Sequence, residues 1–70
     1  MNNIIPRKFN RIVGKMLINT NMDKVNDIIY ITKDEYNRYL AFNTRTNENA
    51  CCFVGMLRNA EIFELIKVEI

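Results

Sequence analysis

Apolar residues near the N-terminus recur with the spacing of one helix face. Five of them lie at i, i+3, i+4, i+7 and i+8: Phe9, Ile12, Val13, Met16 and Leu17. Pro6 suits a first helical position, because its missing N–H would have no partner there. A strand over residues 11–18 is the alternative, but apolar and polar residues do not alternate strictly there. We therefore expect an amphipathic helix from residue 6 to about residue 19.

Strands are expected in the rest of the chain. Residues 28–31 are β-branched or aromatic and are bounded by polar turn formers. Residues 32–43 fit two structures: Thr32 and Glu35 have the spacing of a helix capping box, whereas the alternation over residues 38–42 favours a strand. We favour the strand, which would form a hairpin with the apolar run 50–57.

A turn at residues 58–60 precedes a last apolar stretch, 62–70, and predicts a second hairpin with the run 50–57. Seventy residues are enough for one domain, spanning residues 1–70. The predicted fold class is α+β, with the N-terminal amphipathic helix packed on a small antiparallel sheet of about four strands. The alternative is an all-β, SH3-like small barrel.

The last predicted strand is apolar on both faces. Phe63 and Leu65 point one way, and the opposite face carries Ile62, Ile66, Val68 and Ile70. One short helix can cover only one face of a sheet, so the other face needs a second cover. Closure into a barrel would supply it, but we favour a homodimer or a partner protein.

The chemistry-bearing residues indicate no catalytic centre. The chain has no histidine or serine, so the common nucleophile and base pairs cannot form, and a cysteine nucleophile or a carboxylate pair is what is left. Cys51 and Cys52 are adjacent and predict two small buried residues, with neither a disulfide nor a metal site. We therefore expect no enzyme, no catalytic or metal-binding residue, no cofactor and no small-molecule substrate.

Positive charge is concentrated at the N-terminus. Residues 1–20 carry four basic side chains and no acidic one, namely Arg7, Lys8, Arg11 and Lys15. On the predicted helix these form a basic stripe, which is either a solvated face or a binding surface for an anionic partner. No apolar run approaches the roughly 18 residues of a membrane span. We expect a cytoplasmic protein without a membrane role.

Two functions follow from these features. The first is a non-enzymatic protein-interaction module, a phage or mobile-element inhibitor or regulator that occupies a surface of a larger host protein. Its contacts would be the basic stripe together with Ile62, Ile66 and Val68. The alternative is a dimeric nucleic-acid-binding protein. It would use the basic stripe and four residues that interleave aromatics with cations: Tyr36, Arg38, Tyr39 and Arg45.

Overall fold

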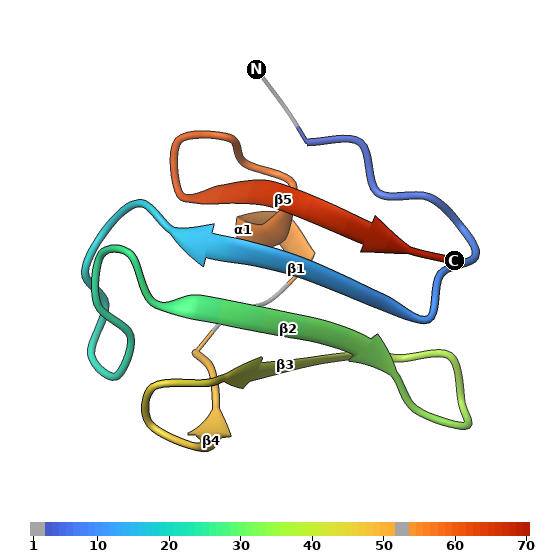
Figure 1. Ribbon diagram of the computed structural model, residues 1–70, viewed down its shortest axis with the longest axis horizontal. Helices are drawn as coiled ribbons and strands as arrows, with labels where there is room; N and C mark the ends of the chain where they lie inside the picture. The colour runs from blue at the N-terminus through green and yellow to red at the C-terminus, as the bar shows by residue number, and fades with distance from the viewer. Residues whose placement is uncertain (1–2, 52–53) are drawn as a thin grey trace.

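The chain forms one five-stranded antiparallel sheet, seen in a computed structural model that describes residues 3–51 and 54–70. The strands are β1 (Arg11–Met16), β2 (Ile28–Lys33), β3 (Tyr39–Asn43), β4 (Glu48–Asn49) and β5 (Phe63–Glu69). A single turn of helix, α1 (Val54–Leu57), precedes β5. The strand order is β4-β3-β2-β1-β5, so the last strand returns to pair with the first (Figure 1).

The predicted N-terminal helix is wrong, and with it the α+β fold class; the all-β alternative fits. Residues 11–16 form β1, which pairs with both β2 and β5. Ile12, Gly14 and Met16 alternate into the core, while Val13 and Lys15 face outward. The alternation looked imperfect because an inward position is occupied by glycine. The ring of Phe63 occupies the space that a side chain at position 14 would need.

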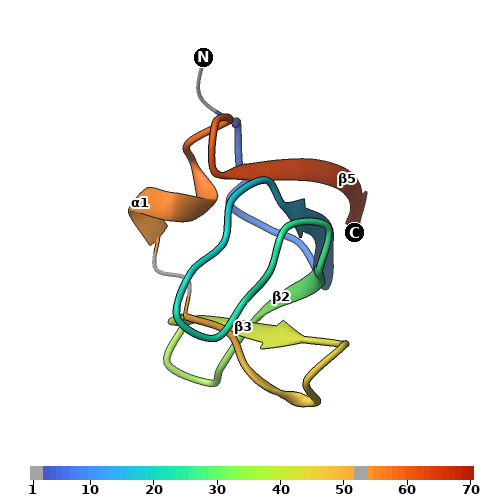
Figure 2. The same cartoon turned by 90° about the vertical axis from the view of Figure 1, so that its left-hand side faces the viewer.

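The sheet is bent, and its concave side holds the core. Figure 2 shows the bend, with α1 on the concave side of the layer. Among the residues that the structure describes, six fully buried apolar side chains form the core: Ile12, Met16, Ile29, Ile31, Leu57 and Phe63. The N-terminal segment closes one side, because the Asn3 amide donates hydrogen bonds to the carbonyls of Leu57 and Phe63 at 3.0 and 2.6 Å. The bend of the sheet, α1 and the N-terminal segment thus enclose the core without a long helix.

A bulge in β5 changes which side chains face outward. Val13 pairs with Lys67, but the next residue, Gly14, pairs with Leu65, so Ile66 is an extra residue in β5. The insertion reverses the alternation, and Val68 packs against the core rather than outside it. The outer side of β5 carries Glu64, Lys67 and Glu69 beside the exposed Ile66. The expectation of an apolar outer face on this strand is therefore wrong.

The remaining predicted elements are partly confirmed. The strand at 28–31 is present and extends to residue 33, and the strand interpretation of 32–43 is confirmed for residues 39–43. The hairpin partner of β3 is β4, at residues 48–49, rather than the run 50–57. That run contains α1, and its residues 52 and 53 lie outside the described residues. The predicted second hairpin does not form, because β5 pairs with β1.

Candidate functional site: a basic cleft

A cleft lies where the N-terminal segment meets the turn between β2 and β3. It consists of two hollows with volumes of about 350 and 480 Å³, which share four lining residues: Arg7, Lys8, Lys33 and Asn37. Tyr39 lines the larger hollow, and Phe9, Asn10 and Ile70 line the smaller one. We call this site the basic cleft. As far as the chain is described, its lining carries three cations and no carboxylate side chain.

Aromatic rings hold one of these cations in place. Lys33 ends β2 and lies opposite Tyr39 in the pairing with β3. Phe9 stacks on Tyr39 with ring centroids 5.9 Å apart and an interplanar angle of 11°. The Lys33 ammonium lies over both rings, at 4.7 and 5.6 Å from their centroids, and donates a hydrogen bond to the carbonyl of Arg7. Cation–π contact and this hydrogen bond therefore position the lysine.

The β2–β3 turn beside the cleft is organised by Asp34. Its carboxylate accepts hydrogen bonds from the backbone N–H groups of Tyr36 and Arg38, at 2.8 and 2.9 Å, and from the Arg38 guanidinium at 2.7 Å. These bonds, first the one from the Arg38 backbone, hold the pKa of Asp34 below its usual value. Asn37 adopts a left-handed conformation with φ 65°, which asparagine tolerates better than most residues.

Several basic side chains outside the cleft have acidic partners. Arg11 pairs with Glu69 at 2.7 Å and Lys15 with Glu64 at 3.5 Å, across the β1–β5 ladder. Hydrogen bonding to the Arg11 guanidinium lowers the pKa of Glu69. The structure also has the pairs Arg38–Asp34, Arg45–Asp27 and Lys67–Glu69. Within residues 3–51 and 54–70, by contrast, Arg7, Lys8 and Lys33 form no ion pair with a carboxylate. The cleft is thus a local excess of positive charge.

The structure divides the predicted basic stripe. Arg7 and Lys8 line the cleft, whereas Arg11 and Lys15 lie on the outer face of β1 and are ion-paired. Of the predicted protein contacts, Ile66 is 54% exposed, while Ile62 and Val68 pack against the core. These three do not form one surface.

The predicted nucleic-acid contacts are divided as well. Tyr39 lines the cleft, and Tyr36 and Arg38 lie on the adjoining turn. Arg45 lies elsewhere and binds Asp27. Sequence reasoning missed Lys33, Phe9 and Asn37 as residues of the cleft. The available signal was a lysine at the end of a strand, but no local pattern connects it to residues 7–9.

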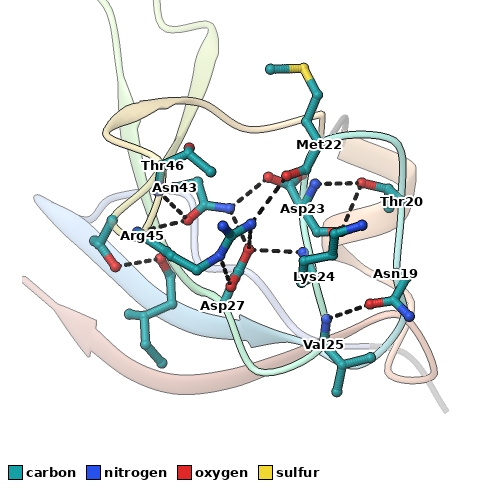
Figure 3. Close-up of polar contacts among 12 residues, drawn as sticks. Asn19, Thr20, Met22, Asp23, Lys24, Val25, Asp27, Asn43, Arg45 and Thr46 are labelled. Atoms are coloured by element: carbon teal, nitrogen blue, oxygen red, sulfur yellow. Dashed lines mark hydrogen bonds and ion pairs between the residues drawn. The ribbon is translucent and has the colours of Figure 1, made fainter.

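A buried polar cluster, also missed, lies on the β1–β2 loop. Asn43 is fully buried, and its amide donates to the carboxylates of both Asp23 and Asp27 at 2.8 Å (Figure 3). Arg45 donates to Asp27 at 2.6 and 2.9 Å, and this bonding lowers the pKa of Asp27 well below its usual range. Asp23 also accepts from the backbone N–H of Cys51 at 2.8 Å. Each carboxylate has its partners, so the cluster fixes the loop to β3.

We also searched the described part of the chain for a metal site, a membrane-spanning helix and a reactive cysteine. There, no group of three or more His, Cys, Asp or Glu side chains is arranged to hold a metal ion. No helix among these residues is long and apolar enough to cross a membrane. Cys51 is a free thiol and is exposed, which corrects the expectation that it is buried; Cys52 lies outside the described residues.

No family model matches the chain, and comparison with curated proteins and with solved structures gives no match.

Proposed function

We propose that this protein is a non-enzymatic nucleic-acid-binding module that holds backbone phosphates in the basic cleft. The observation that carries the proposal is the uncompensated charge of Arg7, Lys8 and Lys33 around a concave site. A phosphate there would replace the missing carboxylates, and guanidinium and ammonium groups both bind phosphate oxygens. The Asn10 and Asn37 amides add neutral hydrogen-bond donors at the same cleft.

The test is salt-dependent binding of labelled oligonucleotides. Fluorescence anisotropy would be measured with single-stranded oligonucleotides between 20 and 300 mM salt. Affinity should fall linearly with salt on logarithmic axes, in proportion to the phosphates neutralised. Replacing Arg7 and Lys8 with glutamine should lower the slope by about 1.4, since each lost phosphate contact on a single strand contributes about 0.7.

A matched control removes the same charge elsewhere. Lys24 and Arg58 are exposed, and among the described residues they form no ion pair with a carboxylate. Their double replacement with glutamine should leave the slope close to that of the wild type. Equal losses in the two double variants would contradict the cleft as the site, and so would the absence of binding at 20 mM salt. Equally tight binding of polyglutamate would favour an acidic protein partner instead.

Protein interaction is a second candidate, and the outer face of the sheet favours it. Val13, Tyr30 and Phe42 lie side by side across β1, β2 and β3. Leu40 and Ile66 are 48% and 54% exposed near this row. An inhibitor or regulator of a larger protein, or a homodimer, would use this surface. Affinity capture from the source cells tests this second function. A folded double variant, Leu40→Asp with Ile66→Asp, should lose the partner, and unchanged recovery of the partner would contradict the proposal.

Either function is compatible with the cytoplasm, which we propose as the location. A reducing compartment suits the exposed, unpaired thiol of Cys51.

A further inference from the structure

The most exposed aromatic ring among the described residues lies beside the basic cleft. Tyr36 is 71% exposed, whereas Tyr30 and Tyr39 are half-buried in the sheet. Its neighbour Asn37 lines both hollows of the cleft. An exposed aromatic side chain is therefore carried by the same turn as a residue that lines the cleft. Each of the two features is ordinary alone, but together they match the two parts of a nucleotide, a flat base and a charged phosphate.

The ring is mounted on an ordered turn. Asp34 fixes the backbone N–H of Tyr36 at 2.8 Å and holds the Arg38 guanidinium, which lies 5.1 Å from the Tyr36 ring centroid. The backbone N–H of Asn37 donates to the Asp34 carbonyl at 3.0 Å, which closes the turn. Little ordering of this segment would therefore be needed when a ligand binds.

We infer that the basic cleft is specific for single-stranded nucleic acid, with a base stacked on Tyr36 and the adjacent phosphate in the cleft. The inference rests on the proposed function and narrows it to one substrate class. In a duplex the bases are stacked on each other, so the Tyr36 ring has no free base face to contact. The only helix in the described chain has four residues, which is too short for a recognition helix in the major groove.

Tyr36 variants test stacking separately from charge. Tyr36→Ala should weaken binding of a single-stranded oligonucleotide by about 5- to 150-fold, the effect of losing one stacked base. The salt slope should not change, because no phosphate contact is removed. Tyr36→Phe keeps the ring and should bind within about 2-fold of the wild type. Leu40→Ala, which truncates an exposed side chain on the outer face, is the control and should also bind normally.

Tyrosine emission gives an independent readout, because the chain has three tyrosines and no tryptophan. Binding should quench the emission of the wild type, and Tyr36→Phe should lose most of that quenching while still binding. Wild-type affinity in Tyr36→Ala, or equal affinity for single strands and duplex, would overturn the inference while the proposed function stands. Failure of all oligonucleotides to bind at low salt would overturn both. Circular dichroism would confirm that each variant is folded.

Discussion

Gly14→Ala is expected to destabilise the fold strongly, because the glycine makes room for a core ring. A Cβ at position 14 would lie 2.1 Å from Cζ and 2.6 Å from Cε2 of Phe63, and 2.6 Å from the backbone carbonyl oxygen of Glu64. The ring is fully buried, so it cannot turn into solvent. The carbonyl belongs to the β1–β5 ladder, so its displacement would disturb the strand pairing.

Overpacking of a core costs about 1–3 kcal/mol, and three close contacts with little freedom to relax place this variant at about 3 kcal/mol. A chain of this length has a total stability of about 4–10 kcal/mol at 0.05–0.15 kcal/mol per residue. The expected fall in Tm is about 12–24 °C, from 4–8 °C per kcal/mol. Thermal and urea unfolding followed by circular dichroism would measure both quantities.

Two further variants identify the cause. Gly55→Ala makes the same chemical change at an exposed position of α1 and should be neutral or stabilising by up to about 1 kcal/mol. Phe63→Leu combined with Gly14→Ala should lose less stability than the sum of the two single variants, because the smaller side chain relieves the clash. The reasoning is refuted if Gly14→Ala unfolds like the wild type, or if the double variant shows strict additivity.

Three further results are expected. The lowered pKa of Asp27 stabilises the fold above the unfolded-state pKa of about 4, so the unfolding free energy should fall as the pH drops from 5 to 2, and less steeply in Asp27→Asn. Asn43→Ala should cost about 2–4 kcal/mol in urea unfolding, because two buried carboxylates lose a donor. Ile66→Asp should change stability by less than about 0.5 kcal/mol, whereas Val68→Asp should cost at least about 2 kcal/mol, and equal effects would contradict the bulge register.

The error at the N-terminus has a specific physical source. Ile12 and Met16 are four residues apart, which places them on one face of a helix and equally on one face of a strand. Phe9 and Leu17 completed the helical pattern although they lie outside β1. Gly14 was the decisive residue: it is unfavourable inside a helix, but in β1 its missing side chain is required by a ring 49 positions away. No local pattern contains that information.

The strand at 28–33 was predictable because β-branched and aromatic residues dominate it and polar turn formers bound it. The strand at 39–43 was predictable from the alternation over residues 38–42. The bulge at Ile66 was not predictable, since it depends on pairing with β1. Without it, the alternation of β5 assigns Val68 to the wrong face. The wrong expectation of an apolar outer face on that strand came from this single shift of one residue.

Register also determines which charges are available for binding. The sequence presents Arg7, Lys8, Arg11 and Lys15 as one basic group. The antiparallel pairing of β1 with β5 brings Glu69 beside Arg11 and Glu64 beside Lys15, so the second half of the group is neutralised within the sheet. Arg7 and Lys8 precede the strand and have no such neighbours. They instead meet Lys33 from β2, which makes the cleft a product of tertiary structure. Glu64→Gln and Glu69→Gln should therefore free a second basic patch on the outer face of β1. The double variant should then bind polyanions more tightly, with a steeper salt slope, without any change at the cleft.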